Sequence, residues 1–264
     1  MMMNEAIKTA ANSNAEADAD TGKHPIKPFM PAVFVPVRDL KQATEWYASL
    51  LDRHIAPQDA QFEHGIYIFE FEGGVQLILD SNIWGGGKPV IMFDTDDIHA
   101  ASAFCDSHPH ESRTEVFIDE FVSVFTVNDD TMICRANRPL DLPPQSMHAL
   151  LGKISRIIVS AGDDAHKVDW YEGLVGKAAE ADPQFGDLRR IKMDKGADLL
   201  INEHRLSSAS GKEPIAVIAT PDLAGALAHL RAKGAEAGEI EGEHGTAYFT
   251  FEDLDGNVFV VSEG

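Results

Sequence analysis

The chain has 264 residues, of which 44% are hydrophobic, and its 43 acidic and 22 basic side chains give a formal net charge of −21. This length and hydrophobic content suffice for one large globular domain or two of ordinary size. The acidity opposes binding to a phosphate backbone, so we expect no nucleic-acid partner, and it favours a cationic small molecule over an anionic one.

The first segment, residues 1–27, is rich in Ala, Asn, Asp and Glu without hydrophobic periodicity, and we expect a disordered leader. It lacks the apolar core of a secretory signal, and no later segment approaches the roughly 20 apolar residues of a membrane span. The two cysteines, Cys105 and Cys134, belong to no CxxC or Cys/His metal spacing. We therefore expect a cytoplasmic protein with no membrane partner.

The next segment alternates strand and helix patterns. Apolar runs predict strands, and Asp39 and Asp163 stand where each can cap the amphipathic helix that follows. In chain order the predicted elements are a strand at 30–37, a helix from Asp39, strands at 64–74 and 75–80, a strand at 89–95, a helix from Asp97, and strands near Glu115, Ser123 and Met132. Pro139, Pro143 and Pro144 then mark a linker.

The part after the linker repeats the part before it. DLKQATEWYASLLDR from Asp39 aligns with DDAHKVDWYEGLVGK from Asp163, and GGVQLILDSN aligns with KGADLLINEH. DTDDIHAASAF aligns with ATPDLAGALAHL, and SVFTVNDDTMICRAN aligns with AYFTFEDLDGNVFVVSE. Because the order of the matches is preserved, we interpret the chain as two homologous domains, residues 28–138 and 154–264, joined by a linker at 139–153.

These repeated motifs resemble the vicinal oxygen chelate superfamily, which includes glyoxalase I, extradiol dioxygenases, fosfomycin-resistance enzymes and bleomycin-resistance proteins. The resemblance covers residues 30–137 and 154–264. It implies an α+β fold of two tandem domains, each made of paired βαβββ units that form a cupped mixed sheet around a ligand.

The resemblance also locates the positions at which enzymes of this family hold a divalent metal ion. They fall on Ala32, Ile78, Val90 and Cys134 in the first half and on Arg156, Leu200, Ile215 and Val260 in the second. Of these side chains only Cys134 can bind even a soft metal. We therefore expect no metal and no cofactor in either cup. The polar residues expected on the same strand faces are Gln76, Asp80, Asp198 and Asn202.

Several residues are candidates for ligand binding, and none is assigned a catalytic role. An inward Arg156 can hold a carboxylate or phosphate bidentately, or it can pair structurally with Asp198 or another acid. Trp84, on a glycine-rich loop, is either a lid over the ligand or a partly buried anchor. Cys134 is either a small core residue or a reactive thiol. The candidate ligand-binding set is Phe34, Trp84, Cys134, Arg156, Asp198 and Tyr248.

Two classes of function follow from the resemblance. The first is a glyoxalase-like and bleomycin-resistance-like protein that sequesters a small molecule, with a preference for a cationic one, in a metal-free cup. The second is an enzyme, either a lyase, isomerase or dioxygenase with other metal ligands or a metal-independent catalyst built on Arg156. We expect a monomer whose halves pair with each other, or a homodimer. The ligand and the number of cups in use stay open.

Overall fold

The computed structural model describes residues 23–55, 62, 64–82, 87–139, 145–161, 166–203, 206–243 and 245–264. Residues 1–22 of the predicted leader, Trp84 and Asp163 lie outside this part of the chain.

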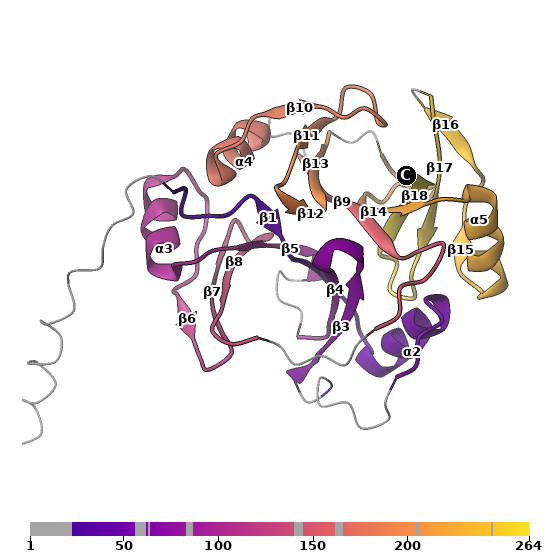
Figure 1. Cartoon of the computed structure of the whole chain (residues 1–264), viewed down its shortest axis with the longest axis horizontal. Helices are drawn as coiled ribbons and strands as arrows, with labels where there is room; N and C mark the ends of the chain where they lie inside the picture. Colours follow the sequence, from indigo (N-terminus) through magenta and orange to yellow (C-terminus); the bar gives the residue numbers. More distant parts are fainter. Residues whose placement is uncertain are drawn as a thin grey trace, which may run out of the picture.

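The first half forms a mixed sheet flanked by two helices (Figure 1). Its elements are β2 (Ala32–Pro36), α2 (Leu40–Leu50), β3 (Ile66–Phe71), the 3₁₀ turn η2 (Glu72–Gly74), β4 (Val75–Asp80), β5 (Val90–Asp94), α3 (Ile98–Ser107), β6 (Phe117–Ile118), β7 (Val122–Val127) and β8 (Thr131–Ala136). Among the described residues the strand order is β3-β4-β2-β5-β8-β7-β6. The β2–β4 and β5–β8 pairs are parallel and the others are antiparallel.

The second half repeats this arrangement. Its elements are β9 (Lys153–Ser160), α4 (Lys167–Val175), β10 (Ala179–Ala181), β11 (Arg189–Ile191), β13 (Asp198–Asn202), β14 (Pro214–Thr220), α5 (Leu223–Ala232), β15 (Glu236–Ala237), β16 (Glu241–Glu243), β17 (Thr246–Glu252) and β18 (Val258–Glu263). In the described chain the order is β10-β11-β13-β9-β14-β18-β17-β15, and β16 also pairs with β17. The predicted α+β class with cupped mixed sheets is confirmed.

Three helices are capped by aspartates, whereas α4 begins after His166, whose side chain makes no capping hydrogen bond, and not at Asp163 as predicted. The Asp39 side chain accepts the Gln42 N–H, and Asp97 accepts the N–H groups of His99 and Ala100. The Asp222 side chain accepts the Gly225 N–H. Each carboxylate therefore satisfies amide groups that the first helical turn leaves without partners.

The first sheet curls until its two ends approach each other. His64 precedes β3 at one end, and Phe121 lies between β6 and β7 at the other. Their ring centroids are nevertheless only 6.3 Å apart. The sheet is therefore concave, and the alternation of side chains along each strand separates a concave face from a helix-covered face.

The helix-covered faces of both sheets share a continuous apolar core. It includes Phe69, Phe93, Tyr171 and Phe249, which are at most 1% exposed. Strand β1 (Phe29–Met30) of the first half also pairs in parallel with β12 (Lys195–Gly196) of the second half. Burial on this scale favours a fixed arrangement of the two halves. No helix in the described segments is long and apolar enough to cross a membrane.

A pair of reciprocal contacts explains the duplicated Trp-Tyr motif. The Tyr47 hydroxyl on α2 donates to Asp253 at 2.7 Å, in the turn between β17 and β18. The Tyr171 hydroxyl on α4 lies 3.1 Å from Thr131 Oγ1, after the turn between β7 and β8. Each half thus inserts a tyrosine against the last hairpin of the other, and Figure 1 shows α3 beside α4 and α2 beside α5.

Candidate functional site

The concave face of the first sheet is mostly apolar. Its lining residues are Ala32, Phe34, Ile66, Ile68, Ile78, Val90, Met92, Val122, Val124, Met132 and Cys134. Phe34, Ile66, Met92 and Val122 are only partly buried. The other seven lining residues are at most 8% exposed, so solvent reaches this apolar floor at these four side chains, where a small organic ligand would make contact.

Cys134 lies on this face as a protonated thiol. Burial, reinforced by the negative charges of Asp94 and Asp119, raises its pKa to about 12. Because the thiolate is the nucleophilic form, Cys134 is unreactive near neutral pH. It contributes a small, polarizable surface to the lining.

Several polar side chains share this face with the apolar residues, among them Glu70, Gln76, Asp80 and Asp94. Asp80 is 3% exposed and accepts the Asn82 N–H at 2.8 Å, and Asp94 pairs with Lys27 at 2.7 Å. Glu70 and Gln76 stand directly opposite each other on β3 and β4 and are partly exposed. No described residue forms a hydrogen bond or ion pair with the side chain of either Glu70 or Gln76, although the charge of Glu70 acts on the nearby Arg53 and opposes the lowering of its pKa by burial.

The concave face of the second sheet is filled by the protein itself. Ile158, Leu200, Val217 and Val260 form its floor, and each is at most 5% exposed. Phe185 and Leu188 from the loop between β10 and β11, Leu206 from the loop after β13, and Tyr248 on β17 cover that floor. The space that stays accessible in the first half is occupied here by side chains.

Arg156 holds this filling loop in place. Its Nε and Nη2 groups donate to the two carboxylate oxygens of Asp182 at 2.7 and 3.3 Å, and its guanidinium lies 5.6 Å from the Phe185 ring centre. Asp182 also accepts the N–H groups of Gln184 and Phe185. The two side chains of this ion pair are 8% and 0% exposed. Arg156 is therefore committed to an internal carboxylate.

The candidate residues from the sequence fall into two separate groups. Phe34 and Cys134 line the first concave face. Arg156, Asp198 and Tyr248 belong to the second, where Asp198 accepts the Met193 N–H at 2.9 Å and lies 3.5 Å from Arg190. Trp84 lies outside the described residues.

Glu70 and Met92 were not among these candidates. The alternation in IYIFEF places Glu70 on the same face as Ile66 and Ile68, so strand periodicity was a usable signal for it. Nothing in the sequence distinguishes Met92 from a core methionine.

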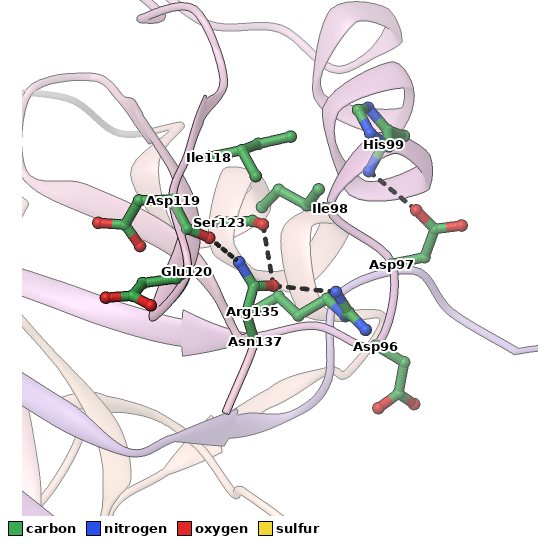
Figure 2. A pocket seen from close by; sticks show the side chains of 10 residues that line it. All are labelled: Asp96, Asp97, Ile98, His99, Ile118, Asp119, Glu120, Ser123, Arg135 and Asn137. Carbon is green, nitrogen blue, oxygen red and sulfur yellow. Dashed lines mark hydrogen bonds between the residues drawn. The ribbon is translucent and has the colours of Figure 1, made fainter. Parts of the chain in front are cut away.

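An open hollow of about 590 Å³ lies outside the cup, between α3 and the β6–β7 hairpin (Figure 2). Its carboxylates already have structural partners. Asp97 caps α3, Asp119 accepts the N–H groups of Phe121 and Val122, and Asp96 pairs with Lys23 and Lys27. These three carboxylates are therefore already engaged within the protein.

No protein-family model and no curated protein matches this sequence. Solved structures do resemble the fold. A catechol 2,3-dioxygenase matches with a TM-score of 0.55 and 12% identity over 89% of this chain and 88% of its own. The Mn(II)-bound glyoxalase from Novosphingobium aromaticivorans matches with a TM-score of 0.55 and 15% identity over 90% of this chain and 82% of its own.

A third structure, a xylose isomerase-like TIM barrel/4-hydroxyphenylpyruvate dioxygenase fusion protein, gives a TM-score of 0.61 at 11% identity. The match covers 91% of this chain, which spans about half the length of the fusion protein. The chain has the vicinal oxygen chelate fold. At these identities the similarity establishes the fold alone.

The side chains at the metal positions of the vicinal oxygen chelate fold do not fit a divalent metal. Ala32, Ile78 and Val90 offer no donor atom, which leaves the Cys134 sulfur as the single donor among these four positions. In the second half Leu200 and Val260 are aliphatic and Arg156 is cationic. Ile215 faces the shared core, because an irregular register between Pro214 and Ala216 changes the alternation, and Val217 takes the inward place.

Within the described residues one group of three potential metal ligands exists, at the junction of the halves and away from both concave faces. Asp52, His148 and His229 have ligand atoms within 4.8 Å of one another. The backbone N–H groups of Leu150 and Leu151 donate to His148 Nδ1, so the proton of neutral His148 is on Nε2, facing Asp52 at 3.3 Å. That arrangement favours a proton over a metal ion.

Proposed function

We propose that the concave face of the first half binds a small, largely apolar organic molecule without a metal ion, and that the protein acts by sequestering this molecule. The partly exposed apolar floor formed by Phe34, Ile66, Met92 and Val122 carries this proposal. Ligand sites are typically concave and mostly apolar, with a few polar groups that fix orientation.

The comparison between the halves supports a binding role over a purely structural one. The equivalent floor in the second half, including Leu200 and Val260, is covered by Phe185, Leu188, Leu206 and Tyr248. A duplicated fold that needed both floors for stability would be expected to cover both. The first half leaves about four apolar side chains in partial contact with solvent, and burying such surface contributes about 25 cal/mol per Å² to binding.

Methyl NMR of ¹³C-methyl-methionine protein tests the proposal. Met92 and Met132 face the first concave surface, whereas Met30 and Met193 lie in the shared core. In a screen of small organic fragments, the resonances of Met92 and Met132 should shift while those of Met30 and Met193 stay in place. Met92→Leu and Met132→Leu variants assign the signals.

As a matched control, the same fragments are screened against a variant in which a larger side chain narrows the site. Ala32→Phe adds a side chain to the first floor, between Gln76 and Met92, and should abolish the shifts. Val260→Ile changes the filled second face and should leave them unaltered. Fragments that shift only Met30 and Met193, or that bind Ala32→Phe as well as the wild type, would rule out this site.

A further inference from the structure

The polar groups on the first concave face specify the charge of the molecule that it takes. Resting on the proposed function above, we propose that this face binds an organic cation, an ammonium or amidinium group attached to an apolar body, with Glu70 as its counter-ion and Gln76 Oε1 as a hydrogen-bond acceptor. The cationic end of the ligand would contact the polar residues of this face, and its apolar body would contact the apolar residues.

Glu70 and Gln76 are placed so that one cationic group can contact both side chains. They are direct partners in the β3–β4 ladder, so their Cβ atoms are about 5 Å apart on one face. A group with two or more N–H donors spans that separation, donating to the carboxylate and to the amide oxygen. Neither side chain forms a hydrogen bond or ion pair with a described residue, whereas Asp80 and Asp94 on the same face do.

The neighbouring strands supply the apolar part of the site. Next to Gln76 across the sheet stands Ala32, which is fully buried, followed by the partly exposed Met92. Phe34 and Ile78 form the adjacent row, two residues further along β2 and β4. An apolar body attached to the cation can therefore lie against the exposed parts of Phe34 and Met92. The thioether of Met92 adapts readily to such a body.

Three described cations near this surface, Lys27, Arg53 and Arg138, already have partners within the protein, which disfavours their pairing with an anionic ligand. Lys27 pairs with Asp94 and Asp96, at 2.7 and 2.5 Å. Arg53 lies on the other face of β3, over the rings of Phe69 and Phe71. At the rim, Arg138 stacks 3.7 Å from the Phe121 ring centre and pairs with Glu120. The net charge of −21 adds a long-range attraction for cations.

A charge series of one shape tests this inference. Benzamidine, benzamide and benzoate carry charges of +1, 0 and −1 on nearly the same framework. We expect benzamidine to shift the Met92 methyl resonance at the lowest concentration, benzamide at a higher one, and benzoate not at all. In Glu70→Gln the dissociation constant for benzamidine should rise about tenfold, toward that of benzamide, because a charge-assisted hydrogen bond is lost.

The control variant is Glu72→Gln, which changes the net charge equally at an exposed position in η2. It should leave benzamidine binding unchanged, and unshifted Met30 and Met193 signals in each variant establish that the fold is intact. Equal binding of the three compounds, or no effect of Glu70→Gln, would overturn the cation assignment while leaving the proposed function standing. No Met92 shift with benzamidine also overturns it, and the fragment screen then decides the proposed function separately.

Discussion

Among single residues, Arg156 and Asp182 keep the second concave face covered. Their ion pair is bidentate and almost fully buried, and it fixes the loop that brings Phe185 over the floor. A buried pair of this kind costs desolvation energy, so its effect is clearest when one partner is removed and the other charge is left without compensation.

Asp182→Asn should therefore lower the free energy of unfolding by about 3–5 kcal/mol, measured by urea denaturation. The matched control is Glu239→Gln, which breaks the exposed pair with Arg231 and should cost less than about 1 kcal/mol. If Asp182→Asn costs no more than this control, the ion pair does not hold the loop.

The sequence could show Arg156 facing inward but not its partner. The resemblance to the vicinal oxygen chelate superfamily implied its position, while Asp182 lies 26 residues away in a loop without a recognisable motif. From the sequence, the partner of Arg156 could be Asp198 or another acid. In the structure the partner is Asp182. Which acid pairs with Arg156 depends on how the loop folds in three dimensions, and local sequence patterns do not predict this.

At the scale of elements, the end of α2, the segment before β9, and α5 meet at a histidine contact. The His148 ring lies 4.5 Å from that of His229, its Nε2 is 3.3 Å from Asp52, and Lys233 pairs with Asp52 at 2.6 Å. His229 Nε2 donates to the Leu50 carbonyl at 2.8 Å. Burial, followed by the charge of His229, lowers the pKa of His148 below its ordinary value of 6.5.

Acid should weaken this contact. In the unfolded chain His148 takes up a proton as the pH falls through about 6.5, whereas in the folded chain its lowered pKa delays uptake. The stabilisation is therefore complete above that pH and declines as the pH falls below it. Protonation at Nδ1 would also displace the N–H groups of Leu150 and Leu151.

Thermal unfolding between pH 7.5 and 5 measures this effect. His148→Gln should flatten the decline in Tm, because the titrating ring is gone. His99→Gln, which removes an exposed histidine on α3 outside this contact, controls for the loss of one imidazole. An unchanged slope in His148→Gln would contradict the assignment.

The elements themselves could be predicted largely from local signals. Asp39, Asp97 and Asp222 marked helix starts because capping depends on a few adjacent residues. Ile215 was expected to face inward because the alignment assumed unbroken alternation. The irregular register at the start of β14 places it in the shared core instead, and the sequence carries no clear sign of such a shift.

At the scale of the whole molecule, the duplication produces an interface with approximate two-fold character. Tyr47 contacts Asp253 and Tyr171 contacts Thr131, but the two contacts differ in chemistry. Asp253 is 8% exposed, so its carboxylate depends on neighbouring donors such as Tyr47 and Asn257. Thr131 is a neutral hydroxyl.

Tyr47→Phe should accordingly cost about 1.5–3 kcal/mol of unfolding free energy, and Tyr171→Phe about 1 kcal/mol, because a hydrogen bond to a charged group contributes more. Urea denaturation of the two variants in parallel measures the difference. Equal losses would mean that the carboxylate of Asp253 does not depend on Tyr47.

Titration with Mn²⁺ tests directly whether the first concave face binds its ligand without a metal ion, as proposed. A bound paramagnetic ion broadens the methyl resonances of nearby methionines. With equimolar Mn²⁺, the signals of Met92 and Met132 should broaden no more than those of Met30 and Met193. Selective broadening of Met92 and Met132 that a chelator reverses would place a metal ion at the first concave face and contradict the proposed metal-free binding.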